Sequence, residues 1–382
     1  MRLVFVSHSG ELGGAELFLC ELVRALQRTG VAELEVVLPW RGALLSRLQA
    51  CGAATWVCRH WPWATLLRSK IPLAFATAAN VAAAVRLAVH LKRRRADAVI
   101  TNSVVNPAGA MAAWAVGIPH VWLVNEFGDL DHGYRFFLGV PRSLALVGRL
   151  SAVVVACSRA VADRLALFMA SDKILVAYYP VTTALDLAPV PPPGRSGSPR
   201  FLVLGKRQEG KGQADAVRAL ALARRAGLDA RLRLVGDEEP AYGVRLAALI
   251  HELELDSFVT LTGFTSRPSA EIDAADVVLM CSRAEGFGRV TVEAMKRRRA
   301  VIGARAGATT ELLEASGGGK LYPVGDVRAL ADAMVTLGTD AGAARRLGEL
   351  GAQWARENCN EERYLAGFLP LLRRVLAAAS TT

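Results

Sequence analysis

The chain has little cysteine and little lysine for its size. Its 382 residues include six cysteines and only seven lysines, although lysine and arginine together number 46. No two cysteines have the C-x-x-C spacing of a zinc or redox motif, so the sequence predicts no metal site. We expect the cysteines to be reduced thiols in the core of a cytosolic protein.

Long apolar runs of the kind that cross a membrane are also missing. The longest charge-free stretch, residues 98–125, contains Pro107 and Pro119 and predicts a strand, a helix and a strand. The apolar run 3–6 is too short for the core of a signal peptide. We therefore expect no transmembrane segment and a cytoplasmic location.

Acidic residues are outnumbered, which gives a formal net charge of +11. Such a charge suits nucleic acid, an anionic membrane face or a phosphorylated substrate. No helix-turn-helix, zinc or RNA-binding signature is present, so we expect no nucleic-acid partner. An arginine- and alanine-rich composition typical of a GC-rich genome is the alternative explanation.

Short apolar strands alternate with helical stretches along most of the chain, which predicts parallel sheets covered on both faces. The length fits two domains, and a stretch rich in proline and glycine interrupts the alternation. We predict an α/β protein with two Rossmann-like, doubly wound domains: a first domain 1–185, a linker 186–199, a second domain 200–362, and a terminal helix in 363–382 that packs back on the first domain. Ligands of such sheets bind beyond the carboxyl ends of the strands, so we expect a cleft with both binding edges facing inward.

Three glycine-containing motifs follow predicted strands. In the first, residues 7–16, the adjacent Gly13 and Gly14 precede a helix, and its N-terminal N–H groups suit a phosphate. A simple tight turn is the alternative. In the second, residues 205–212, Lys206 and Lys211 follow a strand, where two ammonium groups suit a diphosphate. A solvated basic loop is the alternative.

The third motif, residues 285–294, has the most specific pattern. Glu285 and Glu293 lie eight residues apart, and a glycine-rich turn between them opens a helix. Carboxylates accept hydrogen bonds from vicinal hydroxyls, so the pair suits a sugar and a ribose. The alternative is that Glu293 caps its helix and Glu285 lies on the surface.

Together these motifs resemble the retaining glycosyltransferases of the GT-B fold, glycosyltransferase family 4 (glycosyl transferases group 1). That family has an early Gly-Gly turn, a basic loop that opens the second domain, and the pattern E-G-F-G-x-x-x-x-E-A. Segments 301–311 and 321–326 also match. The chain departs from the family at 297–299, where three arginines replace a more neutral stretch.

The resemblance implies that 1–185 is the acceptor-side domain and 200–362 the nucleotide-sugar-binding domain. It also implies roles for individual residues. Glu293 would bind the donor ribose, Glu285 the donor sugar, and Lys206 and Lys211 the diphosphate. The remaining donor-binding positions implied are Gly13, Gly14, Gly205, Gly286, Phe287, Gly288 and Val290. Such enzymes need no metal, because lysines and a helix dipole stabilise the leaving group, and no cofactor besides the nucleotide-diphosphate-sugar donor is expected.

The segment 125–133 of the first domain resembles an acidic version of a family segment that lies near the donor sugar. We expect Glu126 to take part in catalysis and Asn125, His132 and Asn102 to lie on the acceptor side. A structural role for each is the alternative.

Residues 61–95 combine tryptophans, an apolar helix and a basic cluster. This suits docking on anionic lipid headgroups at the inner face of the membrane; a core helix with a solvated basic end is the alternative. The resemblance implies a hexosyltransferase that acts with retention on a saccharide or lipid-linked acceptor in polysaccharide or lipopolysaccharide synthesis. A nucleotide-sugar epimerase of the same fold and a non-enzymatic nucleotide-sugar-binding protein stay open.

Overall fold

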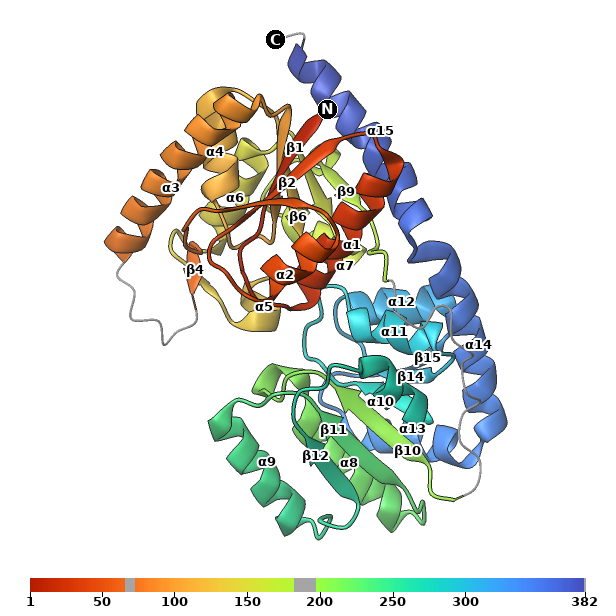
Figure 1. The fold of residues 1–382 in the computed structure, drawn as a ribbon. Helices are drawn as coiled ribbons and strands as arrows, with labels where there is room; N and C mark the ends of the chain where they lie inside the picture. The colour runs from red at the N-terminus through yellow and green to blue at the C-terminus, as the bar shows by residue number, and fades with distance from the viewer. Residues whose placement is uncertain (66–72, 182–196, 381–382) are drawn as a thin grey trace. The chain divides into compact units, whose positions relative to one another are not determined.

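The computed structural model describes residues 1–65, 73–181 and 197–380 of the chain. It divides into two compact units, Met1–Pro180 together with Asn360–Thr382, and Val181–Cys359 (Figure 1). The first segment of the first unit runs to Pro180, whereas the sequence analysis set the boundary at residue 185. The second unit runs to Cys359, whereas the sequence analysis set its end at residue 362. The predicted linker 186–199 lies outside the described residues except for 197–199.

In its described part, the first unit contains a seven-stranded parallel sheet with the order β3-β2-β1-β5-β6-β8-β9. These strands are β1 (Arg2–Val6), β2 (Glu33–Leu38), β3 (Ala54–Val57), β5 (Ala98–Asn102), β6 (His120–Val124), β8 (Val153–Ala156) and β9 (Ile174–Val176). A short antiparallel pair joins β4 (Ala64–Thr65) and β7 (Arg135–Phe136). The helical elements are α1 (Gly14–Thr29), α2 (Ala43–Ala50), α3 (Leu73–Arg94), α4 (Ala108–Val116), α5 (Asp129–His132), α6 (Val140–Leu150), α7 (Arg159–Ala166), η1 (Ser171–Lys173) and the terminal α15 (Glu361–Ser380).

The second unit, where described, has a six-stranded parallel sheet with the order β12-β11-β10-β13-β14-β15. The strands are β10 (Arg200–Leu204), β11 (Arg231–Val235), β12 (Val259–Thr262), β13 (Val277–Met280), β14 (Ala300–Ala304) and β15 (Gly319–Tyr322). The helical elements are η2 (Glu209–Lys211), α8 (Gln213–Arg225), α9 (Pro240–Glu252), α10 (Pro268–Ala274), α11 (Arg289–Lys296), α12 (Ala308–Ser316), α13 (Val327–Thr339) and α14 (Ala341–Asn358).

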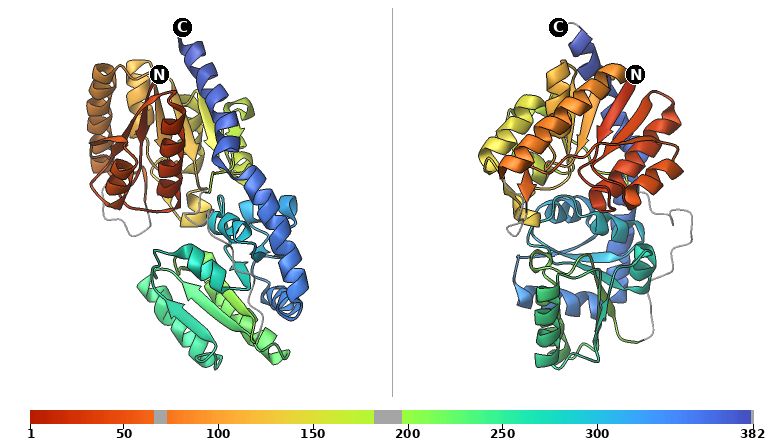
Figure 2. Two further views of the ribbon diagram at one scale, coloured as in Figure 1. Left: turned by 45° about the vertical axis from the view of Figure 1, so that its right-hand side comes forward. Right: turned by 60° about the vertical axis from the view of Figure 1, so that its left-hand side comes forward.

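Both sheets are doubly wound, as their sequences indicate. Helices flank both faces of each sheet (Figure 2), and the inner strands β5, β6 and β14 are buried at every position. A strand that is buried on both faces has apolar residues at every position. Such strands could therefore be recognised in the sequence as short apolar runs between the helical stretches. The predicted α/β architecture of two parallel-sheet units is confirmed.

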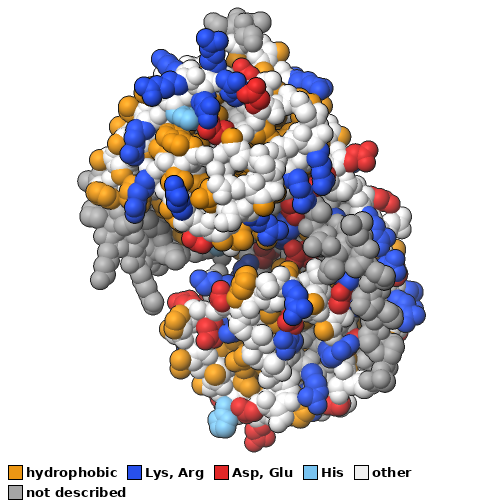
Figure 3. Space-filling model, in the orientation of Figure 1, with side chains coloured by type: hydrophobic (Ala, Val, Ile, Leu, Met, Phe, Trp, Pro, Cys, Tyr) orange, Lys and Arg blue, Asp and Glu red, His pale blue; other side chains and the backbone are white. Residues whose placement is uncertain are grey.

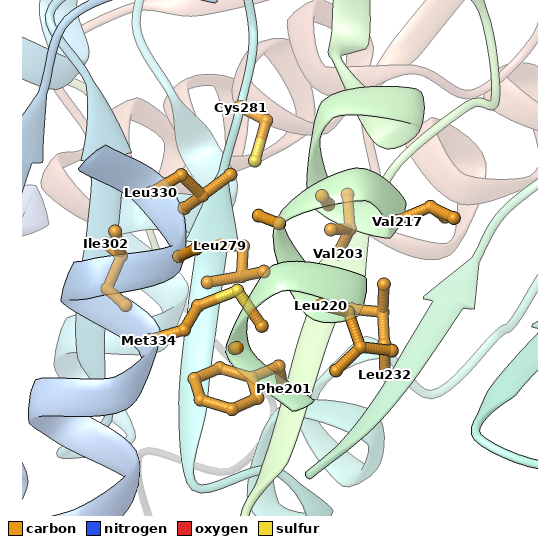
Figure 4. Close-up of a cluster of buried hydrophobic side chains, with 14 of the residues drawn as sticks. Phe201, Val203, Val217, Leu220, Leu232, Leu279, Cys281, Ile302, Leu330 and Met334 are labelled. Carbon is orange, nitrogen blue, oxygen red and sulfur yellow. The ribbon is translucent and has the colours of Figure 1, made fainter. Parts of the chain in front are cut away.

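The core of the second unit lies between its sheet and the helices α8 and α13. Phe201, Val203 and Leu279 of the strands meet Leu220 of α8 and Met334 of α13 (Figure 4). In the first unit, Val4, Val6 and Val99 pack with residues of α3 and α4. The close packing of these cores fixes the register of the strands, and therefore the positions of the loops that follow them.

Register brings the loops that carry the motifs to one edge of each sheet. In the first unit Val6 pairs with Val37 and Thr101, so β1 and β5 end at the same level. In the second, Leu204 pairs with Val235, while Leu202 pairs with Val278 of β13. The order of each sheet changes direction beside β1 and beside β10, which is where ligands of doubly wound sheets bind.

Candidate functional site

The basic loop after β10 divides into an outward and an inward part. Lys206 is exposed, whereas Arg207 is buried and donates from Nη1 to the backbone oxygen of Thr262 at 2.5 Å and from Nη2 to Glu238 Oε2 at 3.0 Å. Arg207 therefore ties the ends of β10 and β12 together. The sequence alone did not distinguish these neighbouring cations.

Lys211 ends the short η2 turn, which is held against the end of β13. Gly212, with φ of +68°, follows it, and a Cβ there would lie 2.1 Å from the backbone oxygen of Cys281. The Arg283 amide also donates to the Gly210 oxygen at 2.9 Å. Only glycine fits at position 212, so the backbone holds Lys211 close to the loop that follows β13.

Glu285 lies in that loop and pairs with Lys211, whose Nζ is 2.9 Å from Glu285 Oε2. Its backbone oxygen accepts from the Ala308 amide at 2.9 Å, and a Cβ on Gly307 would lie 2.2 Å from the same oxygen. The start of α12 thus fixes the backbone at Glu285. The structure brings Lys211 and Glu285 together, although 74 residues separate them.

Glu293 lies in α11, one turn after the glycine-rich loop. Gly288, with φ of +78°, precedes the helix and supplies no side-chain cap. Arg289 begins the helix and donates from Nε to Glu293 Oε1 at 2.9 Å. Around them Gly286 and Phe287 are buried and Val290 is half-buried. The N-terminal part of α11 therefore carries Glu293, which the sequence analysis selected, and Arg289, which it did not.

The Gly-Gly turn of the first unit leads into α1. Gly13 precedes α1 in extended conformation, and a Cβ added to Gly14 would meet no atom within 4 Å. The N-terminus of α1 is thus sterically open at Gly14. Its N–H groups and dipole suit an anion.

Glu16, two residues further on, was missed by the sequence analysis. It is buried, and its Oε1 lies 3.1 Å from Nδ1 of His8. Burial raises the pKa of Glu16 to about 7; burial and the charge of His132 lower the pKa of His8 to about 4. Both shifts favour the uncharged forms. Glutamates are common in the first turn of a helix, where they interact favourably with the helix dipole. The sequence therefore did not indicate that this one is buried beside a histidine.

Glu126 is buried at the end of β6. Its Oε1 accepts from Ser103 Oγ at 2.5 Å and from the Val104 amide at 2.9 Å. Burial, with a smaller contribution from the Asp131 carboxylate, raises the pKa of Glu126 to about 8. Ser103 itself has φ of +78°, unusual for a residue other than glycine. The raised pKa favours the protonated form of Glu126 at neutral pH, and its side chain contacts the strained residue Ser103.

Asn102 and Asn125 are part of a hydrogen-bonded chain. Asn102 donates to the Ala15 oxygen at 3.1 Å and accepts from Asn125 Nδ2 at 2.6 Å; Asn125 Oδ1 in turn accepts from the Tyr179 hydroxyl. Asn102 has no exposed surface. These bonds tie α1 to the ends of β5 and β6, which favours the structural alternative for both residues, while their acceptor-side role stays a prediction.

His132 is exposed at the end of α5, and its ring stacks with Tyr134 at 5.5 Å. Nearby, Asp131 accepts from the amides of Phe127 and Gly128 at 3.0 and 2.8 Å. The segment 125–133 is thus fixed by its own acidic side chain, and His132 remains accessible. Its acceptor-side role is not tested by these contacts.

Neither a metal cluster nor a membrane span is found in the described residues. Within 1–65, 73–181 and 197–380, no group of three or more His, Cys, Asp or Glu side chains is arranged to hold a metal ion. In the same ranges, no helix has the length and hydropathy needed to cross a bilayer. The six cysteines form no disulfide, and all but Cys51 are buried.

Two doubly wound parallel-sheet units, each with glycine turns and charged side chains at the carboxyl edge, define the GT-B class of glycosyltransferases. The model described as Glycosyltransferase Family 4 matches residues 12–185, and that described as Glycosyl transferases group 1 matches 198–340. The chain belongs to this group 1, family 4-like set of glycosyltransferases.

Curated and solved proteins agree with this assignment. The chain is 24% identical over 369 residues to a lipopolysaccharide core biosynthesis glycosyltransferase of Rhizobium meliloti, covering 96% of this chain and 97% of that protein. It is 29% identical to an N-acetyl-alpha-D-glucosaminyl L-malate synthase of Bacillus anthracis, over 39% of either chain. Anabaena Alr3699/HepE, solved in complex with UDP, superposes with a TM-score of 0.80 at 22% identity, over 98% of this chain and 100% of that one. That superposition confirms the fold.

Proposed function

We propose that this protein transfers a sugar from a nucleotide-diphosphate donor to a hydroxyl acceptor, with retention of the anomeric configuration and without a metal ion. The observation that carries the proposal is the set of charges at the carboxyl edge of the second unit. There Lys211 and Glu285 pair at 2.9 Å, and Glu293 lies within the first turns of α11. Ammonium groups and a helix N-terminus suit a diphosphate, and carboxylates suit the hydroxyls on either side of it.

In this mechanism the bond between the anomeric carbon and the diphosphate oxygen breaks first, and its electron pair stays on the diphosphate. Lys206, Lys211 and the positive end of α11 stabilise the charge that appears there. The acceptor oxygen then bonds to the anomeric carbon on the face that the diphosphate leaves. Its proton passes to a diphosphate oxygen. Glu285 positions the sugar hydroxyls and Glu293 those of the ribose.

The nucleotide and the sugar can be identified by binding and product analysis together. UDP-, GDP-, ADP- and dTDP-sugars are screened for a rise in the unfolding temperature, since a ligand that binds the native state stabilises it. The best donor is then incubated with extracted glycolipids in the presence and absence of EDTA. In both conditions we expect release of the nucleoside diphosphate and a product whose new linkage has the same anomeric configuration as the donor. An epimerised nucleotide sugar formed without acceptor, or binding without turnover, would contradict the proposal.

We also propose that the acceptor is lipid-linked and that α3 rests on an anionic membrane surface. Its outward face carries Phe75, Val85 and Val89, with Ala78 and Ala82 between them at helical spacing. Lys92 and Arg93 are exposed at its C-terminal end. We call these seven residues the α3 stripe. In Figure 3 orange and blue side chains lie next to one another over this part of the surface.

Exposed valines and phenylalanine on one helix face favour insertion into the headgroup region, and each nearby lysine or arginine adds about 1 kcal/mol of attraction to anionic lipid. We expect Val85→Glu with Val89→Glu to reduce binding to vesicles of phosphatidylcholine with 30% phosphatidylglycerol by about tenfold or more. Val244→Glu with Leu350→Glu is the control with the same change of charge, because these residues are 72% and 51% exposed on α9 and α14 of the second unit. Cosedimentation measures the effect. Equal binding of the two variants would contradict the proposal.

A further inference from the structure

Arg289 forms an ion pair with the carboxylate assigned to the donor ribose. Its Nε lies 2.9 Å from Glu293 Oε1, and the two side chains are only 15% and 11% exposed. The pair spans one turn of α11, from residue i to residue i+4. The guanidinium is therefore close enough, and shielded enough from water, to fix where this carboxylate points.

Helix stability does not account for this arginine. The N-terminus of a helix is the positive end of its dipole, so a cation in the first turn is destabilising. A basic residue placed four positions before an acidic one is also the weaker of the two orientations for such a pair. Arg289 thus occupies a position that an isolated helix would disfavour, and in the folded protein its guanidinium contacts Glu293.

The second glutamate of the motif is held in the same way. Lys211 Nζ contacts Glu285 Oε2 at 2.9 Å, so each glutamate assigned to the donor receives a hydrogen bond from a cation. A cationic partner favours the ionised form of a carboxylate and orients it. The two ion pairs are formed differently: Lys211 lies in a loop distant in sequence from Glu285, whereas Arg289 lies in the same helix as Glu293.

We propose that Arg289 is a positioning residue for nucleotide recognition: it holds the carboxylate of Glu293 in the orientation in which it accepts hydrogen bonds from the ribose hydroxyls of the donor. The proposal rests on the proposed function. It makes discrimination between a ribonucleotide and a deoxyribonucleotide depend on Arg289, although Arg289 itself need not touch the ligand.

The test compares UDP with 2′-deoxy-UDP, and GDP with 2′-deoxy-GDP, by calorimetry on the full chain. A hydrogen bond to a charged group contributes about 1.5–3 kcal/mol, so we expect the wild-type protein to prefer the ribonucleotide by about 10-fold to 100-fold. Arg289→Gln should reduce this preference to about threefold or less, and Glu293→Ala should abolish it. Arg289→Lys should restore part of it, because an ammonium group keeps the charge but loses the planar geometry.

Arg298→Gln is the matched control, since Arg298 follows the same helix and pairs with the half-exposed Glu349. It should retain the wild-type preference. Unfolding temperatures of all variants show whether each is folded. The proposal is wrong if folded Arg289→Gln binds the ribonucleotide and the deoxyribonucleotide more weakly by the same factor, because Arg289 would then contact the diphosphate. If the Gln variant does not fold, Arg289→Lys is judged by the same criterion. An unchanged preference also overturns the proposal. A wild-type protein that binds none of these four nucleotides, and neither ADP nor dTDP, would instead refute the proposed function.

Discussion

Replacement of Lys211 by methionine is expected to lower the turnover of sugar transfer by about 100-fold to 1,000-fold, the effect of removing one preorganised group that stabilises developing charge. Methionine keeps much of the length of the side chain and removes its charge. The backbone of η2 is fixed by Gly212 and by the Arg283 amide, so the loop should keep its position. The initial rate of nucleoside diphosphate release measures the effect.

Lys320→Met is the control for this variant, because Lys320 is an exposed lysine on β15 of the same unit. It should have wild-type turnover. Circular dichroism and the unfolding temperature establish that both variants are folded. Turnover of the Lys211 variant within a factor of three of the control would remove Lys211 from the mechanism.

Replacement of Glu126 by glutamine is expected to stabilise the protein at alkaline pH. The pKa of Glu126 is raised from 4.5 to about 8 in the folded state, so the folded state keeps a proton that the unfolded state releases. This contribution to stability is complete below pH 4.5 and is lost as the pH rises through 8. Glutamine is neutral in both states, and its Oε1 can accept the same bonds from Ser103 and Val104.

The variant should therefore exceed the wild type at pH 9 by a free energy of unfolding on the order of 2 kcal/mol, at about 1.4 kcal/mol per pKa unit with allowance for relaxation. At pH 5 the two should be nearly equal. Urea unfolding at pH 5, 7 and 9 measures this, with Glu362→Gln as a control at an exposed position of α15. Glu16, whose pKa is raised to about 7, titrates in every protein compared, and its charge also contributes to the raised pKa of Glu126. Parallel stability curves for wild type and variant would contradict the prediction.

The sequence predicted the features that depend on local chemistry. Strands buried on both faces are continuous apolar runs, and glycines mark the turns after β1, β10 and β13, so the sheets and three motif loops were found. The contact between Lys211 and Glu285 was not predicted, because the sequence analysis assigned Lys211 to the diphosphate and Glu285 to the donor sugar. Sequence gives the type of a side chain and the strand end that carries it, but the distance of 2.9 Å results from the packing of Gly212 and Gly307 against backbone.

Charged residues with structural roles were the least predictable. Arg297 and Arg299 belong to a run of three arginines that differs from the family pattern, yet both are buried. Arg297 Nε contacts Asp273 Oδ1 at 2.7 Å, and Arg299 donates to the Asp273 oxygen at 2.8 Å. Such partners lie more than twenty residues away, and only the tertiary fold brings them together. For the same reason Arg207 was not separated from Lys206.

The helices α12, α13 and α14 were not predicted, although they account for much of the chain after residue 304. α14 contains Gly348 and Gly351, which lower helix propensity. In the structure a Cβ on Gly348 would lie 2.2 Å from the Arg298 oxygen, and Gly351 packs against Gly318. These glycines allow close approach of the helix to β14 and β15, so tertiary contact outweighs local preference.

The return of α15 to the first unit has a consequence for biosynthesis. Phe368 and Leu372 of this helix are fully buried, Tyr364 packs edge-on against Phe18 of α1, and Glu361 pairs with Arg24 and Arg28. The amino-terminal unit is therefore the first to be translated and the last to be completed. Domains synthesised early commonly fold while the ribosome is still translating, but here the core beside α1 lacks its cover until α15 has been synthesised. A nascent chain stalled anywhere before Glu361 would expose that apolar surface to chaperones.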